Sequence, residues 1–181
     1  TIEGDEFLMG SIIGLTREDI LQLKHSSEQK SEITIRNSDC SFILSGYASD
    51  IRRILEEAKK EGALSVKELR VTVPYHSCFL TEAARLFEQK VHEMKFNETK
   101  TPIISLIDQK MLQEESSLKA ELIRNIFLPL NWIKTQIHLQ QLGVTAFIEC
   151  GPNKSLVKNS RFLPGNAVFL AANNAEKLMA F

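Results

Sequence analysis

Between residues 7 and 73 the hydrophobic pattern changes repeatedly between that of a strand and that of a helix. Short apolar runs with β-branched residues indicate strands, and Ile51, Ile54 and Leu55 recur at the spacing of one helix face. Thr16 stands before an earlier helical segment, where its hydroxyl can accept an orphan backbone N–H. The expected elements are a strand from residue 7 that Gly14 closes, a helix from residue 17, a polar loop at 22–32, a hairpin of strands at 33–35 and 42–44, a helix that Ser49 and Asp50 cap and that ends near residue 61, and a strand at 66–73.

The order strand, helix, strand, strand, helix, strand is the split βαβ pattern of ferredoxin-like subdomains. In the following residues, strands and helices alternate as in a parallel α/β layer, but two strands alone leave the faces of such a layer unburied. The helices expected there lie at 81–94, 118–127 and 132–142, and the strands lie at 102–107 and 144–148. We therefore expect an α+β chain with a ferredoxin-like βαββαβ subdomain at 7–73, the C-terminal edge of a larger α/β domain at 74–159, and an extension of unclear role at 160–181.

Charge and cysteine content exclude several classes of protein. The 181 residues carry a formal net charge of −1, whereas binding to nucleic acid needs a basic surplus or a basic face. No apolar run approaches the length that crosses a membrane, so a membrane partner is not expected. Cys40, Cys78 and Cys150 suit neither a disulfide framework nor a metal site, and we expect three reduced thiols in a cytoplasmic protein. Because the chain starts at Thr1, close to its first apolar run, we also expect it to be part of a longer protein.

His76 has the most distinctive position of the four histidines. It directly follows an expected strand, and Pro74 restricts the backbone before it, so the imidazole is held at a strand end. Sites in α/β architectures collect at such ends, and histidine exchanges protons near neutral pH. Position alone leaves a structural and a catalytic role equally open. A surface or packing role is expected for the other three, His25, His92 and His138.

The sequence shows no clear nucleophile beside this histidine. Ser77 points to the opposite side of an extended chain from His76, and nothing in the sequence around Cys78 favours its thiolate. The chain has no Gly-x-Ser-x-Gly elbow, no phosphate loop and no dinucleotide fingerprint. The run Gly151-Pro152-Asn153 is interpreted as a turn before a helix.

An ordered set of motifs between about residues 7 and 158 matches a known pattern. Val73-Pro-Tyr-His-Ser77 is similar to Val-Ser-x-Pro-Phe-His-Ser, and the segment at 142–152 is similar to Leu-Gly-x-x-x-Phe-x-Glu-x-Gly-Pro. Further matching segments lie at 10–15, 37–46, 102–105 and 122–132. Through these segments the chain resembles the C-terminal part of the malonyl-CoA:acyl carrier protein transacylase family, which includes the acyltransferase domains of fatty acid and polyketide synthases.

The resemblance implies a ferredoxin-like subdomain inserted in an α/β-hydrolase-like core, and it implies a mechanism. A serine on a Gly-His-Ser-x-Gly elbow attacks an acyl-CoA thioester, and His76 acts as the general base. Main-chain carbonyls of the segment around Asn125 orient the histidine, and Asn37, Tyr75 and Asn125 are expected to contact substrate. The donor is acyl-CoA, the acceptor is the phosphopantetheine of an acyl carrier protein, and no bound cofactor is expected. Tyr75 is expected to favour malonyl over methylmalonyl groups.

Several family features are missing or altered in this chain. The serine elbow and the arginine that binds the carboxylate of the extender unit both belong to the family's N-terminal half, which we expect in the same or a second chain. Asn125 replaces a helix glutamine, and Leu106 replaces an asparagine. Asp39 and Ser41 replace the proline and glutamine of the hairpin. Two alternatives therefore stay open: a hydrolase of the same family that removes stalled acyl groups from carriers, and a non-catalytic module that docks carrier proteins.

Overall fold

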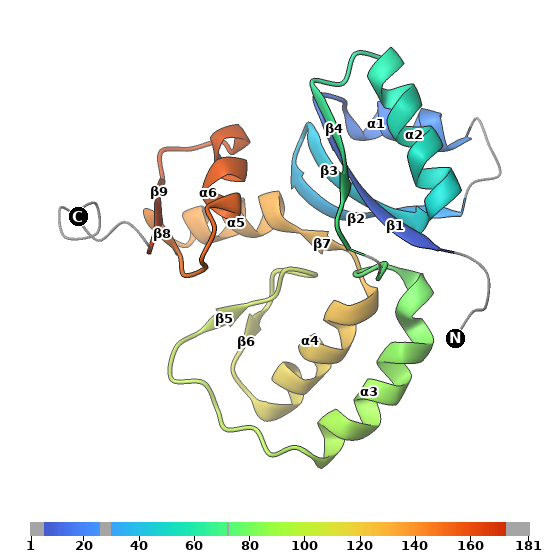
Figure 1. The fold of residues 1–181 in the computed structure, drawn as a ribbon. Helices are drawn as coiled ribbons and strands as arrows, with labels where there is room; N and C mark the ends of the chain where they lie inside the picture. Colours follow the sequence, from blue (N-terminus) through green and yellow to red (C-terminus); the bar gives the residue numbers. More distant parts are fainter. Residues whose placement is uncertain (1–5, 26–29, 72, 173–181) are drawn as a thin grey trace.

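The computed structural model describes residues 6–25, 30–71 and 73–172, and Figure 1 shows how its elements are arranged. Among these residues, no helix is long and apolar enough to cross a membrane. The elements, in chain order, are β1 (Phe7–Ile13), α1 (Arg17–His25), β2 (Ser31–Ser38), β3 (Ser41–Tyr47), α2 (Ala48–Lys60), β4 (Ser65–Leu69), the 3-10 helix η1 (Cys78–Leu80), α3 (Thr81–Glu93), β5 (Ile103–Ile104), β6 (Met111–Leu112), α4 (Glu115–Phe127), β7 (Leu130–Asn131), α5 (Trp132–Gln141), β8 (Ala146–Glu149), α6 (Ser155–Asn159), the 3-10 helix η2 (Ser160–Phe162) and β9 (Val168–Ala171).

The main sheet has five strands in the order β4-β1-β3-β2-β7. Its first four strands are antiparallel, and β7 joins β2 in parallel, with Ile35 opposite Leu130. Both α1 and α2 pack against one face of this sheet, because apolar residues of both helices join the same buried cluster as residues of β1 and β3. The members of this cluster are Leu8, Ile12, Leu15, Ile20, Leu23, Phe42, Leu44, Ala48, Ile51, Ile54, Leu55 and Ala58.

The elements up to β4 follow the order that the sequence predicts. Thr16 caps α1 as expected, since its hydroxyl accepts from the Asp19 N–H at 3.2 Å and donates to the Asp19 carboxylate at 2.7 Å. These hydrogen bonds with Thr16 hold the pKa of Asp19 below its ordinary value. The polar loop expected at 22–32 is shorter than predicted, because α1 runs on to His25 and β2 begins at Ser31; residues 26–29 lie outside the described part of the chain.

Two further boundaries in this region differ from those expected. Ser49 and Asp50 do not cap α2, because the helix already begins at the buried Ala48. The last strand of the first region ends at Leu69 instead of Val73, since its pairing with β1 stops at Met9 opposite Leu69. The chain therefore leaves the sheet earlier than the alternating pattern suggests.

The second part of the chain is built around the helix pair α3 and α4, which lie side by side in Figure 1. The buried strand expected at 102–107 is wrong: only Ile103–Ile104 is extended, it pairs antiparallel with β6, and Ile103 is 44% exposed. The strand ends where the Ser105 hydroxyl accepts hydrogen bonds from the N–H groups of Ile107 and Asp108, which turns the chain.

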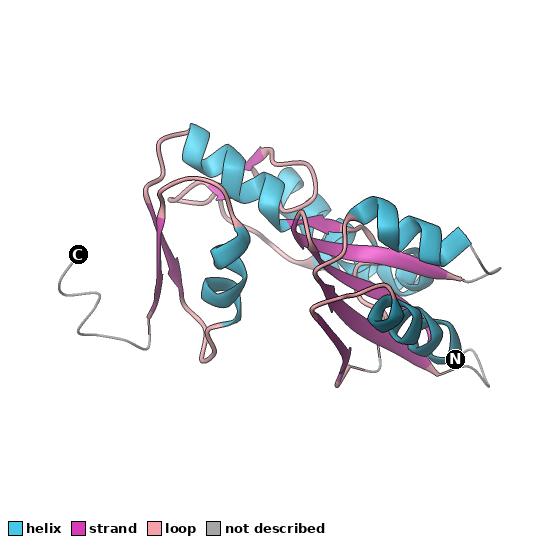
Figure 2. Cartoon of the chain, turned by 90° about the horizontal axis from the view of Figure 1, so that it is seen from above, coloured by secondary structure: helices cyan, strands magenta, loops and turns pink. Residues whose placement is uncertain are grey.

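A separate pair of parallel strands forms near the end of the described chain. β8 pairs with β9, so residues 168–171 of the segment without an expected role complete this pair. Phe147 and Phe169 stack across it, with ring centroids 4.7 Å apart. Figure 2 shows this unit set apart from the five-stranded sheet and joined to it by α5.

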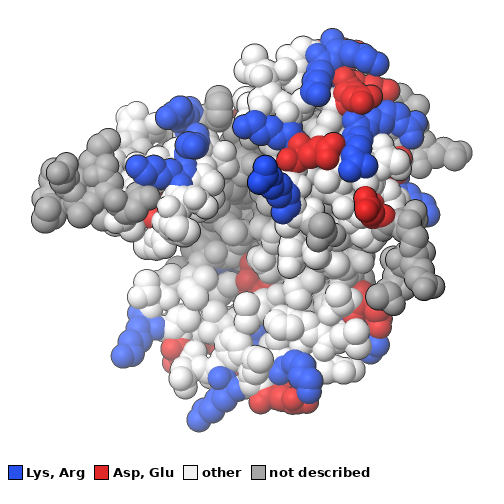
Figure 3. All heavy atoms as spheres, in the orientation of Figure 1, with Lys and Arg blue, Asp and Glu red and all other residues white. Residues whose placement is uncertain are grey.

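The surface is mixed in charge, as the net charge of −1 suggests. On the face drawn in Figure 3, basic and acidic side chains are intermingled over the part that carries the main sheet. The same face is hollowed between the β5–β6 region and the α6 region, and the hollow is lined mostly by uncharged residues. The three cysteines are free.

Candidate active site

His76 lies in a short turn between the main sheet and η1. Pro74 is buried, and the buried Ser77 hydroxyl donates a hydrogen bond to the Pro74 carbonyl at 2.5 Å. The turn places His76 in a left-handed conformation, with φ of +61°. Its N–H donates to the Ile126 carbonyl at 2.9 Å, which attaches the turn to the C-terminal end of α4.

The imidazole of His76 is held in one tautomer. Nδ1 lies 2.6 Å from the Asn125 carbonyl oxygen, and a carbonyl can only accept, so Nδ1 carries the proton. Burial lowers the pKa of His76, although the bond to Asn125 opposes that shift. The neutral ring therefore predominates near neutral pH and leaves the Nε2 lone pair free to take a proton.

The other residues expected at the site do not all lie beside His76. Asn125 holds the ring through its carbonyl and also lines a cavity of about 390 Å³, whose walls are mainly apolar side chains of α4, β5 and β6. The Tyr75 side chain is 44% exposed, and its ring centroid lies 6.1 Å from that of His76. Asn37 is buried near the turn of the β2–β3 hairpin, where Ser38 pairs with Ser41. Its expected contact with substrate stays a prediction.

A hydroxyl that contacts this turn, and a second hydroxyl beside it, belong to residues that sequence reasoning did not single out. The Ser45 hydroxyl, in β3, donates to the Tyr75 carbonyl at 3.3 Å. The Thr34 hydroxyl, in β2, lies 3.2 Å from that of Ser45. Their only sequence signal is a hydroxyl residue within a predicted strand, and serines and threonines at the surface of a sheet share that signal.

Neither neighbouring side chain is arranged as the nucleophile for His76. The Ser77 hydroxyl is engaged with the Pro74 carbonyl. A hydrogen bond with Glu32, together with partial burial and the Glu32 charge, raises the pKa of Cys78 to about 11. The thiol therefore stays protonated, which is the opposite of an activated cysteine.

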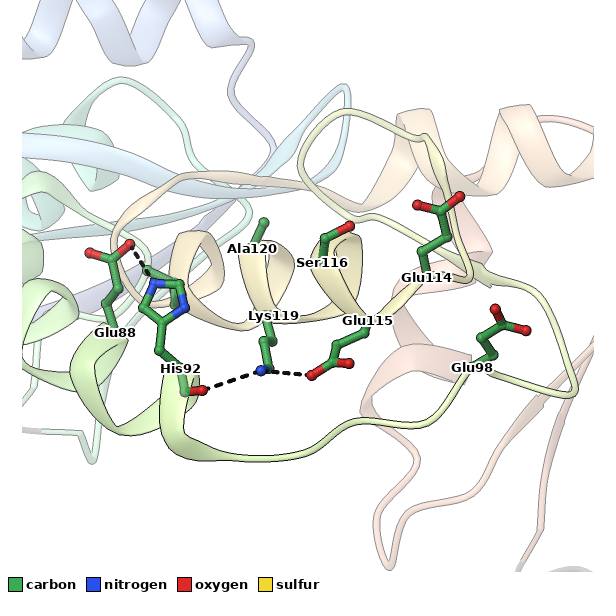
Figure 4. Close-up of a pocket in the computed structure, with 9 residues that line it drawn as sticks. Glu88, His92, Glu98, Glu114, Glu115, Ser116, Lys119 and Ala120 are labelled. Carbon is green, nitrogen blue, oxygen red and sulfur yellow. Dashed lines mark hydrogen bonds and ion pairs between the residues drawn. The ribbon is translucent and has the colours of Figure 1, made fainter.

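A larger cavity of about 620 Å³ lies between α3 and α4 and contains His92 (Figure 4). His92 Nε2 lies 3.5 Å from Glu88, and Lys119 bridges Glu115 at 2.7 Å and the His92 carbonyl at 3.4 Å. The His92 side chain is 65% exposed, in agreement with its expected surface role. The two ion pairs each join residues one helical turn apart, and His92, Glu88 and Glu115 are about half exposed or more, so these charges contribute little. The cavity is therefore not the candidate site.

The part of the chain that the structure describes holds no group of three or more histidine, cysteine, aspartate or glutamate side chains that could bind a metal ion. The site consists of one neutral histidine with a free Nε2, set at the junction of the main sheet and α4. Such a group can take a proton from a hydroxyl or thiol that another polypeptide segment brings to it.

Comparison with known proteins finds curated proteins of similar sequence. No protein-family profile matches it. It is 27% identical over 149 residues to the malonyl CoA-acyl carrier protein transacylase of Synechocystis, with 81% of this chain and 50% of that protein covered. The Bacillus subtilis protein of the same name is 27% identical over 158 residues, and the alignment covers 86% of this chain and 50% of that protein.

A solved structure extends the likeness to the fold. A type II polyketide synthase acyl carrier protein in complex with its malonyl-transacylase matches with a TM-score of 0.89 and 23% identity. That alignment covers 99% of this chain and 59% of the other. The chain thus spans about half the length of the curated relatives it matches. In sequence and in fold, it resembles the malonyl-CoA:acyl carrier protein transacylases, over an extent consistent with their C-terminal part.

Proposed function

We propose that this chain is the C-terminal portion of an acyltransferase that moves a malonyl or related acyl group from CoA to an acyl carrier protein. The observation that carries the proposal is the 2.6 Å contact between His76 Nδ1 and the Asn125 carbonyl, because it leaves Nε2 as a free proton acceptor. The relatives named as transacylases support the same reaction class. The similar fold found in a complex with an acyl carrier protein supports the carrier as partner.

In the proposed mechanism, His76 Nε2 takes the proton of a serine hydroxyl as the serine oxygen attacks the thioester carbonyl of acyl-CoA. The C–S bond breaks, and the imidazolium returns the proton to the CoA thiolate. The acyl-serine is then attacked by the phosphopantetheine thiol of the carrier, with His76 as the base again. The serine oxygen leaves and recovers its proton from His76. The Asn125 carbonyl stabilises the imidazolium both during acylation of the serine and during transfer to the carrier thiol.

The serine and its Gly-His-Ser-x-Gly elbow come from a further polypeptide segment, in the same or a second chain. In this proposal residues 7–73 are the ferredoxin-like subdomain and residues 74–159 belong to the α/β-hydrolase-like core. The strand order β4-β1-β3-β2 supports the first assignment. The protein uses acyl-CoA as donor without a bound cofactor, and we place it in the cytoplasm.

The alternatives gain less support. A hydrolase would use water in place of the carrier thiol, and the relatives named as transacylases do not favour it. A docking module needs no general base, and the relatives named as transacylases favour catalysis over docking alone.

The test is acyl-serine formation from radiolabelled malonyl-CoA, measured in the complete enzyme that includes the serine-bearing segment. We expect His76→Ala to slow acylation by about 10²–10⁴-fold, because the serine loses its general base. His92→Ala, which removes an exposed histidine of α3, should leave the rate unchanged. An unchanged rate in His76→Ala refutes the proposed role of this residue.

A further inference from the structure

The peptide group that joins Tyr75 to His76 is held from two sides. Its carbonyl oxygen accepts a hydrogen bond from the Ser45 hydroxyl at 3.3 Å. Its N–H donates to the Ile126 carbonyl at 2.9 Å. Because this planar group directly precedes the Cα atom of His76, the two hydrogen bonds restrict the backbone rotation that aims the imidazole.

The Ser45 hydroxyl belongs to a buried pair with Thr34. Both residues are 0% exposed, and their hydroxyl oxygens are 3.2 Å apart. When the Ser45 hydroxyl donates a hydrogen bond to the Tyr75 carbonyl, the Thr34 hydroxyl donates either to Ser45 or to the Ile43 carbonyl, also 3.2 Å away. Both hydroxyls are satisfied in either arrangement. A buried hydroxyl without a hydrogen-bond partner destabilises the fold by the full free energy of its desolvation. The hydrogen bonds of Thr34 and Ser45 therefore stabilise this geometry.

The backbone of His76 needs such support. At φ of +61° it lies in the left-handed region, which a side chain with a Cβ atom adopts only when the surrounding structure holds it there. A return to an ordinary conformation would turn the ring away from the Asn125 carbonyl. The hydrogen bonds on the preceding peptide group oppose that return.

We propose that Ser45 is a positioning residue for His76. The buried Thr34–Ser45 pair holds the peptide group before His76, so that Nδ1 stays on the Asn125 carbonyl and Nε2 stays free. The inference rests on the proposed role of His76 as general base. Ser45 acts through the backbone and touches neither substrate nor the reacting atoms.

Both hydrogen bonds on the peptide group between Tyr75 and His76 come from residues that the main sheet positions. Thr34 and Ser45 lie in the adjacent strands β2 and β3. Ile126 stands shortly before Leu130, which pairs with Ile35, the neighbour of Thr34 in β2. The position of His76 is therefore set by the sheet from two directions, and it does not depend on the turn at 73–77 alone.

The test uses ¹⁵N NMR of His76 in this 181-residue chain, with the His76→Gln spectrum to identify the signals. We expect Ser45→Ala to reduce the fraction of the Nδ1-protonated tautomer at least about twofold, because the ring loses its fixed approach to the Asn125 carbonyl. The pKa of His76 should move upward toward its ordinary value, because the burial that lowers it is a larger cause than the Asn125 hydrogen bond that raises it. Ser45→Thr restores a hydroxyl and should return both quantities toward those of the unsubstituted chain.

Ser38→Ala is the matched control, since Ser38 is also 0% exposed in the same hairpin but its hydroxyl contacts Cys40. It should leave the tautomer and the pKa of His76 unchanged. If Ser45→Ala lowers the free energy of unfolding but leaves both NMR quantities as they were, its role is only structural and the inference is overturned.

The complete enzyme separates this inference from the proposed function. There we expect Ser45→Ala to slow acyl-serine formation by about 10–100-fold with little change in KM, since the base is misplaced and not removed. Acylation that persists in His76→Ala would overturn the proposed function, while the NMR result would still decide whether Ser45 positions the ring.

Discussion

The part of the chain that forms β1 to β4 and the part from residue 73 onward differ in how they bury apolar side chains. In the first part, residues of β1, β3, α1 and α2 share one cluster, and Ile12, Phe42 and Ile54 are fully buried in it. In the second part, every residue of α4 keeps some exposure to solvent. Large apolar side chains that are 38–57% exposed occur along its elements, namely Leu86, Met94, Ile103, Met111, Leu122, Leu142, Ile148, Leu156 and Val168.

The difference shows that one region completes its own core and the other does not. Single exposed apolar side chains are normal, but several on neighbouring elements mark surfaces that contact other protein. The short ladders β5–β6 and β8–β9 are also too small to be stable by themselves. Both features agree with the proposal that a further polypeptide segment completes the acyltransferase.

The largest expected effect is a loss of stability, measured for a Leu→Ala substitution in each of the two regions. Leu44→Ala removes a fully buried side chain from the cluster, and we expect the free energy of unfolding to fall by about 2–5 kcal/mol. Leu122→Ala removes a side chain that is 43% exposed on α4, and the change should stay within about 0.5 kcal/mol. Urea unfolding followed by circular dichroism measures both. Equal losses would break the comparison, because they would mean that α4 is as tightly packed as the sheet.

A smaller effect tests the contact between the two regions. The Glu32 carboxylate in β2 accepts from the Cys78 N–H at 2.9 Å, and together with partial burial it raises the pKa of the thiol to about 11. We expect Glu32→Gln to increase alkylation of Cys78 by iodoacetamide at least about tenfold, because the thiolate fraction rises tenfold for each unit by which its pKa falls. Peptide mapping by mass spectrometry gives the rate, with Cys150 as the internal reference.

Asp39→Asn is the control for charge, since Asp39 lies in the same hairpin but pairs with Arg36. It should not alter the rate at Cys78. Rapid alkylation of Cys78 in the unsubstituted chain would show that Glu32 does not hold the thiol and that the two regions separate in solution.

The smallest effect concerns His76, which stands at the junction of the regions. Burial lowers its pKa in the folded chain, so the unfolded chain, with an ordinary value of 6.5, binds the proton more readily. The stability that neutral His76 contributes is complete above that value and is lost as the pH falls through it toward the folded pKa. When the pH is lowered from about 7.5 to about 5, we expect the free energy of unfolding of His76→Asn to fall less than that of the unsubstituted chain. Identical losses in urea unfolding would show that the ring is not buried.

Hydrophobic periodicity predicted the order of the elements in the first region, but not all of their bounds. Ile51, Ile54 and Leu55 predicted α2 because the side chains that bury against the sheet are also those that define the helical period. The strand expected at 102–107 was wrong because a continuous apolar run cannot show where a hydroxyl turns the chain, and Ser105 ends the strand. The parallel partner of β2 was also missed, since two residues at 130–131 are too few to show a period.

One contact of the candidate site was predicted, whereas the catalytic role of His76 and the substrate contacts stay predictions. Position and resemblance together indicated His76, and the resemblance indicated that carbonyls near Asn125 orient it. The distance of 2.6 Å between His76 Nδ1 and the Asn125 carbonyl oxygen agrees with that orientation. The left-handed conformation of His76 and the support from Ser45 could not be predicted, because both depend on segments that are distant in sequence. No local pattern encodes a hydrogen bond between a strand hydroxyl and a backbone carbonyl in a later turn.

The parallel pairing of β7 with β2 sets an order in which the chain folds. The four antiparallel strands all lie within residues 7–69, so they can pair without any residue of β7. The fifth strand requires a long loop to close between residues near 35 and 130, which is slow because the entropy of closure must be lost first. Until then the edge of β2 stays open to other chains, and the Ile126 carbonyl has not reached the His76 amide. His76 therefore gains the hydrogen bond that fixes its amide only after the loop between residues 35 and 130 has closed.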